Sequence, residues 1–284
     1  IITESDCFLR KYNCSTKLLE RDQIKKVPIS SQQDEEHNWE LFETILNKIE
    51  EGDEIIFDIT HSFRSFPIMA LIILNYARIL KNASLKRLLY GCWEMNDNGK
   101  PPTAPIIDMT EMISLLDWAH GVNSYLETGN ASVIQSLKSG VTHEEAEALI
   151  TLADCSHKFH QIMQTCRAPE IPQGLNELRN ALKQAKDMKI PGSNHFKELV
   201  DKMDEKIGDF TDRPIMDDYW AAKWCFENGL IQQSYTMLQE GIISAVCRVM
   251  DLDINKRGIR TRISSAIRQL VEEKKQKNAK MEIS

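Results

Sequence analysis

The sequence has 284 residues, of which 42% are hydrophobic and 27% charged, and its formal net charge is −7. This composition is that of a folded protein rather than a disordered chain, and the length allows two domains. Affinity for nucleic-acid phosphates comes from concentrated Lys and Arg, so an acidic chain does not coat nucleic acid indiscriminately. Any site for an anion must therefore be local.

Cysteine spacing and hydropathy indicate the compartment. The seven cysteines are scattered without a C-x-x-C pair. Their odd number, with no signal peptide expected, is typical of reduced thiols in the cytoplasm. The longest apolar run, residues 66–76, is too short to cross a bilayer, so we expect no membrane insertion. Because the sequence begins with Ile1 rather than Met, we expect it to be part of a longer chain.

The first 110 residues alternate between helix and strand patterns. Apolar residues at helical spacing predict helices, and short β-branched runs predict buried strands. In chain order we predict a helix over residues 36–51, a strand over 53–60, a helix over 67–80, a strand over 85–94 and a short strand within 104–109. Because parallel strands need crossover helices, this order predicts an α/β domain with a parallel sheet over residues 1–110.

From residue 111 onward the pattern is all-helical, and residues 111–284 are predicted to form a second domain. No convincing strand is present, and amphipathic segments follow one another. The predicted helices cover residues 111–127, 142–166, 174–188, 194–207, 217–227, 231–250 and 259–275.

Polar residues gather where the strand over residues 53–60 turns into the next helix, in the sequence DITHSFRS. In a parallel sheet, ligands bind at the carboxyl ends of strands, and the first turn of a helix offers free N–H groups to anions. Arg64 adds forked donors, so a phosphate-bearing ligand fits this junction. The structural alternative is that Ser62 or Ser65 caps the helix, Asp58 orders the turn, and His61 and Arg64 pair with neighbours.

The stretch DITHSFRSFP resembles the D-x-T-H-G-x-R-S signature of the CRISPR-associated Rossmann-fold (CARF) sensor domain, in the branch that usually carries a C-terminal helical HEPN ribonuclease domain. NWELFETILNKIEEGDEIIFDIT before it, LLYGCWE and APIIDMTEMISLLDWAHGVNSYLETGN after it, and DDYWAAKWCFENGLIQQSYTMLQEGIISAVCR in the second half are also similar to this family. The resemblance implies a Rossmann-like CARF domain over residues 1–110, whose first strand is not visible here. A helical linker and a HEPN-like helical domain would then occupy residues 111–284.

The resemblance also implies a function. CARF domains dimerise and bind cyclic oligoadenylate, a second messenger made by type III CRISPR complexes, and this binding switches on the attached endoribonuclease. The implied partners are cyclic oligoadenylate, with cyclic tetra-adenylate as the expected ring, single-stranded RNA as substrate, and a second copy of the chain or a higher oligomer. We expect no cofactor, metal, DNA or membrane partner, and a location in a prokaryotic cytoplasm.

The family's ligand residues carry over by position. Thr60 and Ser62 would hydrogen-bond ribose or phosphate, and Arg64 would neutralise charge or stabilise the turn. Ser62 stands where the family usually has Gly. The full implied set is Thr60, His61, Ser62, Phe63, Arg64 and Ser65, with His61 on the ligand backbone and Tyr90 and Gly91 bordering an adenine.

The catalytic residues stay unassigned. HEPN ribonucleases use an Arg followed about four to six residues later by a His, and none of the seven His follows an Arg at that spacing. The expectation is a motif outside this sequence, and the alternative is a non-catalytic sensor or regulator. An ordinary nucleotide-binding α/β enzyme is disfavoured because no G-x-G-x-x-G or P-loop is present.

Three weaker features have structural explanations. Cys155, His157, His160 and Cys166 resemble metal ligands, but we expect core packing there. Tyr219, Trp220, Trp224 and Phe226 follow a helical period, which indicates packing rather than base stacking. Ten Lys or Arg face four Asp or Glu between residues 248 and 280, which suits either RNA contact or a solvated helix face.

Overall fold

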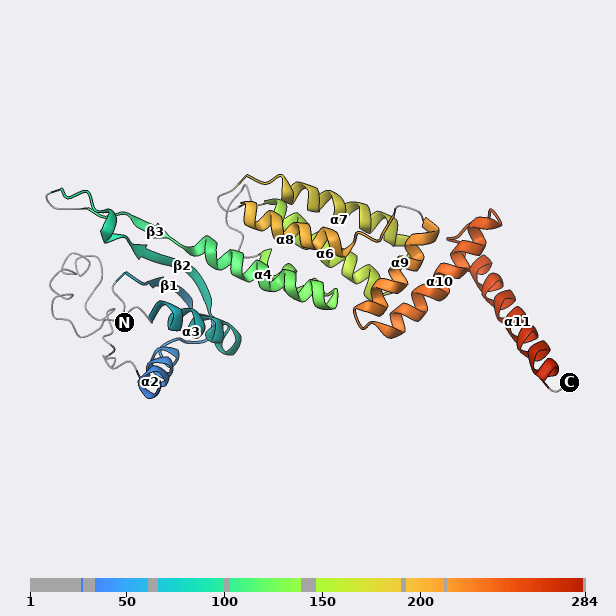
Figure 1. Cartoon of the computed structure of the whole chain (residues 1–284), viewed down its shortest axis with the longest axis horizontal. Helices are drawn as coiled ribbons and strands as arrows, with labels where there is room; N and C mark the ends of the chain where they lie inside the picture. The colour runs from blue at the N-terminus through green and yellow to red at the C-terminus, as the bar shows by residue number, and fades with distance from the viewer. Residues whose placement is uncertain are drawn as a thin grey trace. The chain divides into compact units, whose positions relative to one another are not determined.

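The computed structural model describes residues 27, 34–60, 66–99, 103–138, 147–189, 193–211 and 214–282. The chain divides into two compact units, Ile1–Ile113 and Ser114–Ser284, coloured blue to green and green to red in Figure 1. The sequence pattern predicts a division between residues 110 and 111. Each unit is described on its own below.

The first unit combines helices with a small sheet. Helix α2 begins after Asp34, whose carboxylate accepts the His37 N–H at 2.9 Å and so caps the helix. Gly52 supplies the left-handed turn, with φ of 77°, that leads into the first strand. The elements in order are α2 Glu35–Leu46, β1 Glu54–Asp58, α3 Phe66–Lys81, β2 Ser84–Gly91, a 3-10 turn Trp93–Met95 and β3 Ile106–Asp108.

The sheet is mixed, with strand order β1-β2-β3. Strands β1 and β2 are parallel, as predicted, because helix α3 crosses over between them. Strand β3 is antiparallel to β2, so the prediction of a wholly parallel sheet is wrong at this strand. The described residues between β2 and β3 contain a 3-10 turn and no α-helix, whereas a parallel strand needs a crossover connection that is usually helical.

The core of the first unit lies on one face of its sheet. Helices α2 and α3 lie on the same side of the sheet (Figure 1), and Ile55 and Phe57 of β1 pack against them. The fully buried members are on α3, where Ile73 and Ala77 have no exposed surface. Ile56, which points to the opposite face of β1, is 64% exposed.

The second unit contains helices and no strand among its described residues. All the predicted helical segments contain a helix, and α5, which has only six residues, was not predicted. The helices are α4 Thr110–Thr128, α5 Ser132–Leu137, α6 Glu147–Gln164, α7 Ile171–Lys186, α8 Ser193–Lys206, α9 Pro214–Glu227, α10 Ile231–Val249 and α11 Arg257–Glu282, with a 3-10 turn at Ala168–Glu170. The boundary between the units falls inside α4.

Aromatic side chains hold the centre of this unit. The ring of Phe159 on α6, with no exposed surface, meets those of Phe210 at 5.8 Å and Trp224 at 6.1 Å, both edge to face. Trp224 is therefore a core residue, as the helical period of α9 indicated, whereas Tyr219 and Phe226 on the same helix are exposed.

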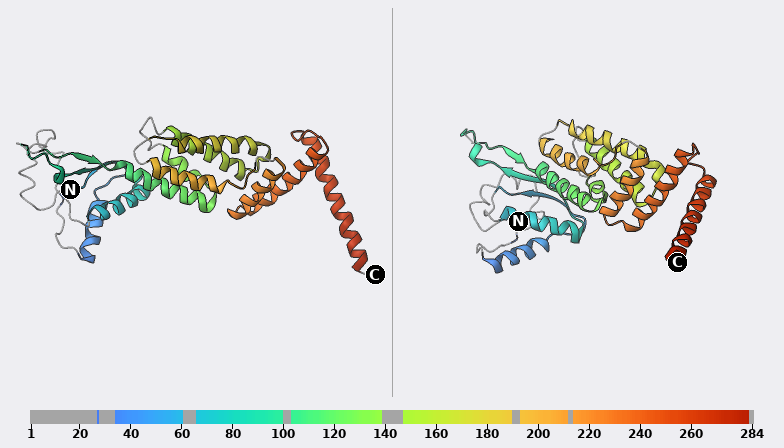
Figure 2. Two further views of the ribbon diagram at one scale, coloured as in Figure 1. Left: turned by 45° about the horizontal axis from the view of Figure 1, so that its top comes forward. Right: turned by 45° about the vertical axis from the view of Figure 1, so that its right-hand side comes forward.

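Ion pairs tie the last three helices together. Asp218 of α9 is buried and receives a 2.8 Å hydrogen bond from Arg248 of α10. Arg260 of α11 donates to Glu240 and, at 3.0 Å, to the Ser244 hydroxyl, both on α10. Beyond this contact α11 extends away from α10 (Figures 1 and 2). No helix among the described residues is long and apolar enough to cross a membrane.

Candidate ligand-binding corner

The candidate site lies where the chain leaves β1 for α3. Thr60, Tyr90 and Gly91 belong to the described residues, and Thr60 comes two residues after the end of β1. The predicted ligand residues His61, Ser62, Phe63, Arg64 and Ser65 lie outside the described residues. The geometry therefore concerns the two strand ends beside these residues, which share one edge of the sheet because β1 and β2 are parallel.

Asp58 closes a turn at the end of β1. One carboxylate oxygen accepts the backbone N–H of Thr60 at 2.8 Å and the Thr60 hydroxyl at 2.5 Å. This is an Asx turn, in which a short acidic side chain replaces the next backbone partner. The Ile59 N–H donates to the Leu89 carbonyl at 3.0 Å, which is the last backbone hydrogen bond to β2 before Thr60. The Asp58 carboxylate therefore fixes how the chain departs from the sheet.

Thr60 joins this turn to the end of β2. Its hydroxyl oxygen accepts the backbone N–H of Gly91 at 2.7 Å. A Cβ built on Gly91 would lie 3.0 Å from the Thr60 methyl carbon and 3.1 Å from its hydroxyl oxygen. The absence of a side chain at Gly91 thus allows the close approach, and two predicted site residues are brought into direct contact.

Tyr90 interacts with an acidic neighbour. Its phenol donates to the Glu94 carboxylate at 3.1 Å, and this bond raises the pKa of Tyr90. The Glu94 backbone N–H and the Tyr90 phenol lower the pKa of Glu94, which keeps its negative charge. A phosphate is disfavoured beside Glu94, whereas a donor such as a purine amino group is suited to it.

A second Asp-x-Thr turn lies at the end of β3. Asp108 accepts the Thr110 N–H at 2.9 Å and the Thr110 hydroxyl, and the pKa of Asp108 is lowered, chiefly by the hydroxyl bond. The Thr110 hydroxyl oxygen in turn accepts the Leu88 N–H of β2 at 3.0 Å. Strand β2 is therefore bonded on both sides by the threonine of an Asp-x-Thr turn, and Asp58 and Asp108 are both in register with Leu89.

The described cations of β2 already have acidic partners. Lys86 pairs with Glu54 at 2.8 Å, and Arg87 pairs with Asp108 at 3.3 Å. These exposed pairs contribute little stability, but they reduce the positive charge that β2 offers to an anion.

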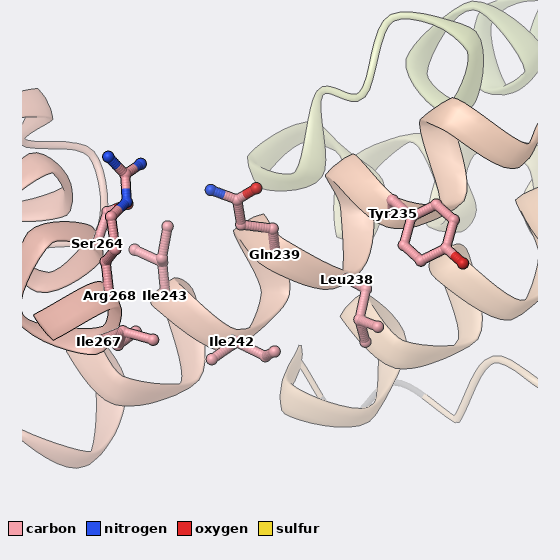
Figure 3. A pocket seen from close by; sticks show the side chains of 8 residues that line it. All are labelled: Tyr235, Leu238, Gln239, Ile242, Ile243, Ser264, Ile267 and Arg268. Atoms are coloured by element: carbon pink, nitrogen blue, oxygen red, sulfur yellow. The ribbon is translucent and has the colours of Figure 1, made fainter. Parts of the chain in front are cut away.

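A separate groove of about 350 Å³ lies between α10 and α11 in the second unit. Its lining is mostly apolar, with Leu238, Ile242 and Ile267, and Figure 3 shows Gln239 and Arg268 with their polar ends on the other side. No sequence motif indicated this groove. Two Arg of the basic stretch, Arg248 and Arg260, bind acidic residues of the protein itself, which favours a structural role for part of that stretch.

The cysteines and histidines of α6 do not form a metal centre within the described residues, where no group of three His, Cys, Asp or Glu is placed to hold a metal ion. His160 is buried, and burial lowers its pKa. The His157 and His160 rings lie 6.5 Å apart along one helix.

Asp58 is the participant that the ligand-residue prediction left out. Asp58 belonged only to the structural alternative, in which it orders the turn, and in the structure it does order the turn. The signal was available as a repeat, because Asp-x-Thr occurs at Asp58–Thr60 and again at Asp108–Thr110, each at the end of a predicted strand.

These features define a small mixed α/β unit with a polar corner at its strand ends, followed by a helical unit. No protein-family model matches the chain. The chain is 28% identical over 222 residues to the CRISPR-associated protein MJ1674 of Methanocaldococcus jannaschii, an alignment that covers 76% of this chain and 32% of that protein. The chain thus spans about a third of the length of the relative that it matches.

Proposed function

We propose that this chain is part of a CRISPR ancillary effector whose first unit is a CARF sensor for cyclic oligoadenylate, with cyclic tetra-adenylate as the expected ring. The observation that carries the proposal is the similarity to a CRISPR-associated protein over 76% of the chain. The sequence DITHSFRS, at the carboxyl end of a strand that pairs in parallel with its neighbour, supports the choice of ligand.

Different residues of the corner would bind the phosphates and the adenines of the ligand. Phosphates need donors, and these would come from the backbone and side chains of residues 61–65, with Arg64 as the main charge. Glu94 and Tyr90 favour an adenine edge over a phosphate, because the Glu94 carboxylate accepts hydrogen bonds and repels anions. A ring with alternating phosphates and adenines suits both environments.

The helical unit is proposed to be the effector. In this account it is HEPN-like and, within the full-length prokaryotic protein, forms a metal-independent endoribonuclease for single-stranded RNA. A ligand shared by two sensor units would favour one packing of the dimer and bias the attached helical units. It can shift that equilibrium only by binding one state more tightly than the other.

The test is a calorimetric titration of the chain with cyclic tetra-adenylate and cyclic hexa-adenylate, using linear tetra-adenylate as the control ligand. Arg64→Ala and His61→Ala should weaken binding of the preferred ring, because they remove charge and a donor. Arg87→Ala is the matched control, since Arg87 pairs with Asp108. Undiminished affinity in both corner variants would remove the pocket assignment.

The effector part needs the full-length protein. RNA cleavage measured with and without the ring should rise on ligand addition if the helical unit belongs to a ribonuclease. Ring binding without ligand-dependent cleavage would instead favour the sensor or regulator alternative.

A further inference from the structure

We propose that Asp58 is a positioning residue for the ligand corner, acting through Thr60 and Gly91. The Asp58 carboxylate holds Thr60, and Thr60 holds the Gly91 N–H, so the chain leaves β1 in a fixed direction relative to β2. The inference rests on the proposed function and deepens it, because it assigns Thr60 to holding the corner instead of binding a phosphate.

The hydrogen-bonding capacity of Thr60 supports this assignment. A threonine hydroxyl has one donor hydrogen and two acceptor lone pairs. The hydrogen is given to Asp58 at 2.5 Å, and one lone pair receives the Gly91 N–H at 2.7 Å. Phosphate oxygens are acceptors, so the remaining lone pair of Thr60 has nothing to offer them. Thr60 therefore links the end of β1 to the end of β2.

The packing at Gly91 gives the same result. With a would-be Cβ only 3.0 Å from the Thr60 methyl carbon, Gly91 and Thr60 have no space between them for a ligand group. The Gly91 N–H holds the Thr60 hydroxyl, and the lack of a side chain at Gly91 leaves the space that Thr60 occupies.

The turn at Asp108 and Thr110 provides a control within the same sheet. It repeats both the bonds within the turn and the bond to a β2 N–H. The two turns flank the same residue of β2, Leu89, and because β1 and β3 run in opposite directions, Thr60 bonds to Gly91 toward one end of β2 and Thr110 to Leu88 toward the other. Loss of either turn should cost similar stability, but only the Asp58 turn leads into the ligand corner.

The experiment compares matched variants by calorimetric titration with cyclic tetra-adenylate and by thermal unfolding. Asp58→Ala and Thr60→Val should weaken binding roughly 5- to 30-fold, the factor expected for one or two lost hydrogen bonds, while Asp108→Ala and Thr110→Val leave affinity within about twofold. All four should lower the melting temperature by similar amounts. Asp58→Asn and Thr60→Ser should restore affinity, because the amide oxygen and the hydroxyl keep the same bonds.

The outcomes separate this inference from the proposed function. A wild-type chain that binds no cyclic oligoadenylate refutes the proposed function. If the wild type binds, unchanged affinity in the Asp58 and Thr60 variants overturns the positioning role alone. An equal loss of affinity in the Asp108 and Thr110 variants also overturns the positioning role alone. If a variant does not fold, amide hydrogen exchange in the wild type tests the bond between Thr60 and Gly91. A protected Gly91 N–H is expected, and an unprotected one overturns the inference.

Discussion

The two units bury their apolar residues to different extents. The helical unit encloses a large core in which whole side chains such as Phe159 and Leu152 have no exposed surface. The α/β unit has a small core on one face of its sheet, and Ile56, Ile68 and Ile72 are exposed among its described residues. Among the described residues, most of the stability that burial provides therefore belongs to the helical unit, whereas the candidate ligand-binding residues Thr60, Tyr90 and Gly91 belong to the α/β unit.

The largest expected effect breaks the helical core. Phe159→Ala removes a fully buried ring that contacts Phe210 and Trp224, and should lower the free energy of unfolding by about 3–5 kcal/mol. Phe226 of α9 is 60% exposed, so Phe226→Ala is the control and should change the free energy of unfolding by less than about 0.5 kcal/mol. Equal losses in chemical denaturation would show that this core is not as well packed as described.

The next effect concerns the buried ion pair of the same unit. Arg248→Ala leaves the Asp218 carboxylate buried without its 2.8 Å partner and should destabilise the fold by about 3 kcal/mol at pH 7. Burial already raises the pKa of Asp218, so protonation at low pH should relieve part of this loss.

The double variant Arg248→Ala/Asp218→Asn is the control for this pair, because it removes the unpaired charge. It should recover much of the stability at pH 7, measured by denaturant unfolding. A double variant no more stable than Arg248→Ala would mean that the loss comes from packing rather than from the carboxylate.

Much of the fold was predictable because the relevant signals are local. The period of apolar residues identified the long helices, and Pro67 identified the start of α3. The helix over residues 259–275 extends to Glu282 in the structure, since no Gly or Pro follows Gly258 to stop it. Helix α5 has too few residues for its period to be read, and the direction of β3 depends on the connection from β2, whose described residues form no α-helix.

The site was predictable in composition but not in its contacts. The sequence motif indicated a polar corner and included Thr60 and Gly91, yet 31 residues separate these two and nothing local says that one accepts the N–H of the other. That contact follows from the parallel register of β1 and β2, which only the folded sheet defines. The ligand roles of His61, Ser62, Phe63, Arg64 and Ser65 stay predictions.

A smaller effect of pH should again come from the helical unit. His160 is 5% exposed, and burial, helped by the nearby His157, lowers its pKa below the ordinary 6.5 despite a hydrogen bond with the Gly129 backbone. Below pH 6.5 the unfolded chain takes up a proton that the folded chain resists, so the stability present above 6.5 is lost as the pH falls through the folded pKa.

Replacing His160 should make the stability depend less on pH. His160→Gln is expected to reduce the loss of stability between pH 6.5 and pH 5, measured by denaturant unfolding at each pH, whereas His195→Gln at an exposed position should keep it. An unchanged slope in His160→Gln would assign the acid sensitivity to other groups.

The smallest expected effect on stability comes from a substitution in the α/β unit. Gly91→Ala forces a Cβ against Thr60 and should weaken binding of cyclic oligoadenylate roughly fivefold, equivalent to about 1 kcal/mol, with little change in the unfolding of the helical unit. Gly99→Ala, in the loop between β2 and β3, is the control for a glycine away from the corner. Equal affinities in wild type and Gly91→Ala would separate Gly91 from the site.

The most direct measurement of the central claim is the stoichiometry of cyclic tetra-adenylate binding to the purified chain, followed by calorimetry and by light scattering of the complex. The account predicts saturation at one ring for two chains, with a dimer in solution and a marked loss of affinity in Arg64→Ala. No detectable binding, or binding by a monomer that Arg64→Ala leaves unchanged, would contradict it.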